Sequence, residues 1–177
     1  MFKYLFIILT LIFPLNLCLK AESDFEKALE NIQVRKNTMQ NIWLRVKRLS
    51  PYVELNETVD YEKKLAEQDA KEINLLLSKA RAFWPENTNL SGRSYTNATP
   101  AIWALQDYFY KLYDDAELAS KELSTFIEKD NIEGTAIAMC NLGKACGTCH
   151  ANFRRLLTSQ LANEVSGWSG KYIKDCN

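Results

Sequence analysis

The residues of this sequence that are best suited to chemistry are two cysteines and a histidine close to its C-terminal end. They stand in the run Lys144-Ala-Cys146-Gly-Thr-Cys149-His150, and His150 is the single histidine of the chain. The spacing Cys-x-x-Cys-His is typical of covalent haem attachment. On a helix, positions i, i+3 and i+4 lie within an arc of about 100°. Two thiols can therefore join two haem vinyl groups while the imidazole reaches the iron.

Other uses of these side chains stay open, although they are less favoured. A redox-active pair of the thioredoxin type follows a strand at the start of a helix, whereas the residues before Cys146 have a helical pattern. A zinc site could add Cys140 to the motif, but Cys140 lies about 240° round the helix from Cys146. His150 could also be a structural core residue. A single histidine excludes zinc sites that need two imidazoles.

Amphipathic helices are expected to position the motif. Ser23 and Glu26 form a capping box that begins a first helix, and Ser50-Pro51 ends it. Its apolar residues recur at intervals of three or four, as expected for one buried face. They are Phe25, Leu29, Ile32, Met39, Ile42, Trp43, Val46 and Leu49.

Three more helices are predicted. The second covers residues 59–83, has a charged early half expected in solvent, and is ended by Trp84-Pro85. Residues 86–98 are rich in Asn, Thr, Ser and Gly and predict a loop. The third helix begins at Pro100, and the fourth begins at the cap Asn131 and extends past Arg155. The inward residues of the third helix are Ile102, Leu105, Phe109, Leu112, Leu118 and Phe126. The expected fold is therefore an all-α, antiparallel four-helix bundle.

The two ends of the chain have separate features. Residues 1–21 are expected to be a cleaved signal peptide, since the apolar run Tyr4–Leu17 is shorter than the roughly 20 residues of a spanning helix. A retained anchor or a lipid on Cys18 is less favoured. Residues 22–158 form the bundle domain, and 159–177 form a tail. Cys140 and Cys176 remain after signal removal and haem attachment, which suggests a disulfide in an oxidising compartment.

The motif and its surroundings resemble a known family. The segment Gly143–Arg154 resembles the haem-binding segment of the class II c-type cytochromes, the cytochrome c-prime family. The run Arg35-Lys-Asn-Thr-Met39 looks like the family's Arg-x-x-x-distal-residue segment. Pro100-Ala-Ile-Trp103, with Phe83-Trp84-Pro85 before it, is similar to the low-spin, methionine-ligated branch. The likeness covers residues 25–155 and implies one covalent haem c between the first and fourth helices, often in a homodimer.

Site residues follow from the motif and the resemblance together. Cys146 and Cys149 attach the haem, and His150 is the proximal iron ligand. With the one histidine used, the methionines of the mature chain are Met39 and Met139, and Met39 is the expected sixth ligand because it occupies the family's distal position. An open or blocked site is the alternative. Arg35 and Arg154 are expected to meet haem propionates, and Phe153 and Trp103 are expected to pack near the porphyrin. For Arg35 and Arg154, exposure to solvent stays open, as does a plain core role for Met39, Phe153 and Trp103.

The expected function is that of a periplasmic, monohaem c-type cytochrome that carries single electrons between redox partner proteins and is not an enzyme. The alternative is a five-coordinate haem protein that binds nitric oxide or carbon monoxide. A haem-free helical interaction module is a third hypothesis. Lys and Arg number 22, as do Asp and Glu, so nucleic acid is not an expected partner. Stable insertion into a membrane is not expected either.

Overall fold

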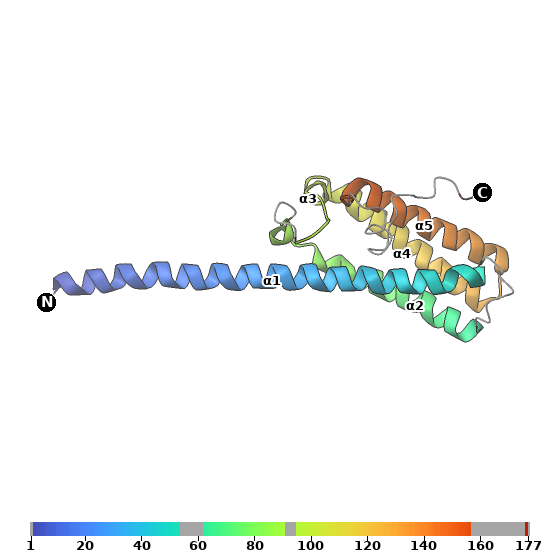
Figure 1. Cartoon of the computed structure of the whole chain (residues 1–177), viewed down its shortest axis with the longest axis horizontal. Coiled ribbons are helices and arrows are strands. Elements are labelled where there is room, and N and C mark those ends of the chain that lie inside the picture. The colour runs from blue at the N-terminus through green and yellow to red at the C-terminus, as the bar shows by residue number, and fades with distance from the viewer. Residues whose placement is uncertain (1, 54–61, 91–94, 157–175, 177) are drawn as a thin grey trace.

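Four long helices form an antiparallel bundle in the computed structural model (Figure 1). The structure describes residues 2–53, 62–90, 95–156 and 176, and for residues 2–22, 51 and 52 it describes the backbone alone. The bundle helices are α1 (Phe2–Val53), α2 (Lys63–Ala80), α4 (Gln106–Glu128) and α5 (Ile132–Phe153). Shorter pieces join α2 to α4: η1 (Arg81–Phe83), η2 (Glu86–Thr88) and the single turn α3 (Ala101–Ala104). The described residues contain no strand, and the predicted all-α four-helix bundle is confirmed.

The core lies where α4 packs along α5 and α2, with α1 lying on α2. Its apolar residues recur at helical spacing, so each helix turns one face inward. Fully buried side chains include Leu49, Ile73, Phe109, Leu123, Ile127 and Leu142. The predicted cap of α5 is confirmed, because the Asn131 side chain accepts a hydrogen bond of 2.9 Å from the Gly134 amide.

Helix α1 is longer than predicted at both ends. In the full chain it runs without interruption from Phe2 through Ser23, and its N-terminal part projects beyond the bundle (Figure 1). Ser23 is therefore not an N-cap here, because the residues before it are helical as well. At the other end the helix continues through Pro51 to Val53, because the φ of proline is helical and the hydrogen bond that its nitrogen cannot donate is lost only in the last turn.

The predicted third helix is broken in two. At Leu105 the backbone leaves the helical region, with φ −124° and ψ 47°, so α3 ends and α4 begins as a separate helix. Leu105 and Leu118, which were expected to be buried, are 56% and 58% exposed. Tyr113, Ala116 and Ala119 take the inward positions instead. Trp43 was also expected inside and is 37% exposed.

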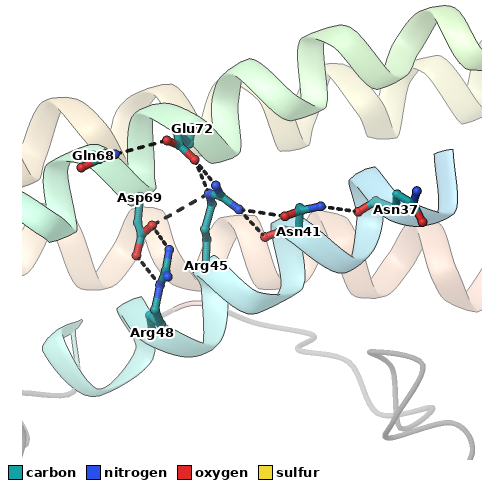
Figure 2. A network of polar contacts seen from close by, with 7 residues as sticks. All are labelled: Asn37, Asn41, Arg45, Arg48, Gln68, Asp69 and Glu72. Carbon is teal, nitrogen blue, oxygen red and sulfur yellow. Dashed lines mark hydrogen bonds and ion pairs between the residues drawn. The ribbon is translucent and has the colours of Figure 1, made fainter. Parts of the chain in front are cut away.

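The early half of α2 is not simply solvated, which corrects the prediction. Asp69 is only 5% exposed, and its carboxylate accepts hydrogen bonds from the Arg48 guanidinium, one of them 2.9 Å long. Arg45, also on α1, donates to the Glu72 carboxylate over 2.6 Å. Figure 2 shows both arginines reaching from α1 to the two acids on α2. Opposite charges on two helices thus cover an acidic side chain that the sequence of α2 alone places in solvent.

The end of α5 is held in place by backbone hydrogen bonds. Helix α5 stops at Phe153, not beyond Arg155, because the next residues pair with the segment before α3. The Thr99 amide donates to the Phe153 carbonyl (2.9 Å), and the Arg155 amide donates to the Asn97 carbonyl (2.7 Å).

The expected disulfide between Cys140 and Cys176 is present. The rest of the tail 159–177 lies outside the described residues. In the part of the chain that is described, no helix has the length and apolar character needed to cross a membrane.

Candidate haem-binding site

The residues of the Cys-x-x-Cys-His motif lie together on α5. Cys146 and Cys149 are free thiols, and both pack against the hydrophobic core. Their position in the interior of a long helix does not fit the thioredoxin arrangement. Cys140 is engaged in its disulfide, so it is not available for the zinc site considered above. Within the described segments no group of three or more His, Cys, Asp or Glu side chains could hold a metal ion.

A cavity opens beside the motif. It encloses about 300 Å³ and is bounded by α1, α4, α5 and the connection between α2 and α3. Cys149 and His150 form one wall, and Met39 stands in the lining contributed by α1. The remaining lining residues are Arg35, Lys36, Gln40, Trp84, Tyr95, Thr96, Asn97, Ala98, Ile102, Phe109, Tyr113, Phe153 and Arg154. A mostly apolar cavity that is lined by Cys149 and His150, with Cys146 one helical turn before His150, has the donor set and the walls that a covalently attached haem needs.

Burial sets the protonation of the motif. It lowers the pKa of His150 to about 4, with a smaller contribution from the positive charge of Arg154. The imidazole is therefore neutral at pH 7, which is the form that coordinates iron. Burial likewise raises the pKa of Cys146 to about 11 and that of Cys149 to about 12, so both thiols keep their protons.

The two candidate methionines are separated by the fold. Met39 lines the cavity together with Cys149 and His150, whereas Met139 packs against the core and is absent from the cavity lining. The structure thus brings the predicted thioether ligand and the predicted imidazole ligand to one cavity. Iron ligation by Met39 stays a prediction.

Arg35 is a buried cation in the wall of the cavity. It is 3% exposed, and its guanidinium carbon lies 4.0 Å from the centre of the Trp84 ring. Its Nη1 donates to the Phe83 carbonyl (3.2 Å) and the Thr88 hydroxyl (3.4 Å), and its Nη2 donates to the Thr96 hydroxyl (3.1 Å). These acceptors are neutral, and burial lowers the pKa of Arg35 to about 10. A carboxylate in the cavity, such as a haem propionate, would supply the missing negative charge.

The other predicted residues fall into two groups. Phe153 and Arg154 line the cavity, and Phe153 is buried with its ring edge-on to Phe109, the ring centroids 5.3 Å apart. Burial lowers the pKa of Arg154. Trp103 does not line the cavity. Its indole N–H donates to the carbonyls of Trp84 (3.2 Å) and Pro85 (3.3 Å), so it holds the backbone behind the wall.

Three wall residues were not predicted as part of the site. From the sequence, Trp84 was expected only to end the second helix and to contribute to the resemblance to the methionine-ligated branch. Tyr113 is buried, which raises its pKa, and its hydroxyl accepts a hydrogen bond of 3.3 Å from the Trp84 indole. Tyr113 stands four residues after the buried Phe109 on α4, and this helical spacing is the signal that could have identified it. Thr96 lies in a polar loop where nothing in its neighbours marks it as buried.

Known proteins resemble this chain in sequence and in fold. A sequence model of the family described as Cytochrome C′ matches residues 30–154, most of the chain. The chain belongs to the cytochrome c′ family. Cytochrome c-554 of Cereibacter sphaeroides is 28% identical over 102 residues, which cover 56% of this chain and 74% of that protein. Like its family, this cytochrome is a monohaem protein with one covalently attached haem c.

Solved structures of cytochromes c′ share the fold. A nitric oxide complex of a mutant cytochrome c prime from Alcaligenes xylosoxidans superposes with a TM-score of 0.66 at 16% identity, covering 73% of this chain and 97% of that one. Cytochrome c′ from Rubrivivax gelatinosus gives a TM-score of 0.65 at 19% identity, covering 72% and 97%. At such low identity the likeness concerns the four-helix bundle alone.

Proposed function

We propose that this cytochrome c′ binds a diatomic gas, nitric oxide or carbon monoxide, at a haem iron held by His150. The observation that carries the proposal is the cavity that His150 shares with Met39. Because the chain has one histidine, the far side of the iron has no imidazole available to close it. A relative of the same fold has been solved as a nitric oxide complex, which supports a gas-binding role.

In this proposal each site residue has a separate task. Cys146 and Cys149 attach the haem, and the neutral imidazole of His150 binds the iron. Arg35 and Arg154 offer positive charge to the propionates, and Phe153 packs against the ring. The haem supplies the iron that binds the gas or exchanges one electron; the chain supplies attachment, orientation and a dry surrounding.

A second function is favoured by the nature of Met39. A thioether is a soft ligand for iron, and Met39 is the methionine that reaches the cavity. If it binds the iron, the protein is a low-spin electron carrier with His150 and Met39 as axial ligands. It would then exchange single electrons with redox partner proteins and catalyse no reaction of its own.

The visible spectrum with and without carbon monoxide tests these two functions. For the gas-binding function, the ferrous protein takes up carbon monoxide readily, and the ferric protein lacks a sulfur-to-iron charge-transfer band. Replacing Met39 with Ala then speeds carbon monoxide binding without changing the number of axial ligands. If the ferric protein shows the band, and if Met39→Ala abolishes it, the gas-binding function is wrong and the electron carrier takes its place.

We further propose that the protein works in the bacterial periplasm. Removal of residues 1–21 as a signal peptide would leave Ser23 near the new N-terminus, where its capping box can begin α1. Residues 22–158 then form the cytochrome domain, and 159–177 form its tail. As in many members of the family, two copies would pair as a homodimer. N-terminal sequencing of the mature protein tests the cleavage, and light scattering tests the dimer.

A further inference from the structure

The segment from Thr96 to Thr99 connects the two helices that face each other across the cavity. On one side, the Thr96 hydroxyl accepts a hydrogen bond of 3.1 Å from Arg35 on α1. On the other side, the segment pairs with the end of α5 through the bridge between Ala98 and Arg154. The Thr99 amide to Phe153 carbonyl bond and the Arg155 amide to Asn97 carbonyl bond extend that pairing.

Thr96 is the point where the two sets of bonds meet. Its hydroxyl oxygen also accepts a hydrogen bond of 3.1 Å from the Ala98 amide, and the residue is buried. One oxygen thus joins the Arg35 guanidinium to the backbone that pairs with α5. Arg35 lies one helical turn before Met39 on α1, and Arg154 lies one turn after His150 on α5.

Arg35 also fixes the other end of the same connection. Its Nη2 donates to the Thr96 hydroxyl, and its Nη1 donates to the Phe83 carbonyl and the Thr88 hydroxyl. The Thr88 hydroxyl in turn donates to the Pro85 carbonyl (2.7 Å). The planar guanidinium therefore spans both ends of the stretch that walls the cavity. A lysine ammonium has neither the fork shape nor the reach to make these bonds together.

We propose that Arg35 and Thr96 are positioning residues that set how closely the Met39 turn of α1 approaches the His150 turn of α5. This inference rests on the proposed haem site. The bonds of Thr96 hold the two helices at a fixed spacing, and that spacing decides how much room a gas or the Met39 thioether has at the iron. Neither residue needs to touch the iron for this effect.

The test replaces Thr96 with Val, which keeps the shape and removes the hydroxyl. The control is Thr135→Val, because Thr135 is also buried but its hydroxyl donates to the carbonyl of Asn131, the cap of its own helix. Loss of a buried hydrogen bond to a charged group weakens local structure by roughly tenfold or more in equilibrium terms. Amide hydrogen exchange at residues 96–99 and 154–155 of the holoprotein should therefore rise roughly tenfold in Thr96→Val and stay unchanged in Thr135→Val.

Two further variants separate positioning from charge and from general damage. Thr96→Ser restores the hydroxyl and should restore slow exchange. Arg35→Lys keeps the positive charge but loses the fork, so exchange should rise as in Thr96→Val. If Thr96→Val does not fold, Arg35→Lys serves in the same comparison with Thr135→Val.

Spectra of the variants test whether the spacing of the two helices affects the iron. In Thr96→Val the rate of carbon monoxide binding to the ferrous protein should rise, or, if Met39 is a ligand, the ferric charge-transfer band should weaken. Exchange and spectra equal to those of Thr135→Val, or a failure of Thr96→Ser to restore them, would overturn the proposal. A wild type that does not bind carbon monoxide refutes the gas-binding function alone, since the exchange comparison does not depend on it.

Discussion

Cys140, in the middle of α5, is bonded to Cys176, so the chain end is fastened to the helix that carries the haem motif. The two cysteines are separated by 36 positions, and their Cα atoms lie 5.7 Å apart. A cross-link that closes a loop of this length restricts the unfolded chain and so stabilises the folded protein by about 3–4 kcal/mol.

Replacing both Cys140 and Cys176 with Ser should therefore lower the free energy of unfolding by about 3 kcal/mol while the haem stays attached. Changing both residues avoids a stray thiol that could pair with Cys146 or Cys149. Denaturant unfolding followed by haem absorbance and by helical circular dichroism measures the effect. An unchanged midpoint would show that the bond does not contribute to stability.

The attachment residues can be tested without reference to any activity. In the double variant Cys146→Ala and Cys149→Ala, no thiol remains at the motif to bond a haem vinyl group. Acid–acetone extraction should then remove all haem absorbance from the protein, whereas the wild type keeps it. The mass of the wild type should exceed that of its polypeptide by one haem. Haem that resists extraction from the variant would contradict the assignment.

Much of this architecture could be predicted from local patterns. The spacing of apolar residues indicated the bundle helices, Asn131 marked a cap, and the leftover cysteines suggested the disulfide that the structure contains. The helices and the cap depend on residues within a few turns of one another, and the disulfide follows from counting the cysteines that are left over. The Cys-x-x-Cys-His motif is likewise a local pattern in the sequence.

The features that failed depend on contacts between distant segments. Asp69 is buried because Arg48 and Arg45 lie across from it on α1, and no pattern within α2 reports that pairing. The partners of Arg35 come from residues 83–96, a stretch whose composition predicts only a loop. Leu105 is exposed because the helix breaks at that residue, and no local pattern signals the break. In each case tertiary packing overrides the local preference.

The contact between Arg45 and Glu72 predicts a dependence of stability on acid. Hydrogen bonds from Arg45 lower the pKa of Glu72, with a smaller effect from Gln68. A carboxyl group whose pKa is lower when folded adds stability above its unfolded pKa of about 4.3, and this stability is lost as the pH falls through the folded value. Glu72→Gln should therefore unfold at a lower temperature than the wild type at pH 7, and the difference should shrink below about pH 4.

A matched substitution controls this measurement. Glu67 lies on the same helix, and its carboxylate is 3.9 Å from Lys63, too far for a hydrogen bond. Glu67→Gln should show a smaller change in melting temperature across the same pH range. Equal pH dependence in the two variants would mean that the Arg45 contact has no special effect on stability.

Gly134 is required by the packing of α4 on α5. The Phe126 ring of α4 lies against it, 2.7 Å from where a Cβ atom would stand. Gly134→Ala should lower stability by about 1–3 kcal/mol, although alanine usually favours a helix. Thermal unfolding measures the loss. Adding Phe126→Leu should recover part of it, and an unchanged melting temperature in the single variant would contradict this account.

The position of the haem motif in the last bundle helix has a consequence for biosynthesis. A growing polypeptide completes α1, α2 and α4 before the first cysteine of the motif exists. Covalent attachment of the haem must therefore follow synthesis of the other three bundle helices, and their apolar faces stay incompletely covered until α5 joins them. Cys176 is made later still, so closure of its bond to Cys140 can follow attachment and seal the finished product.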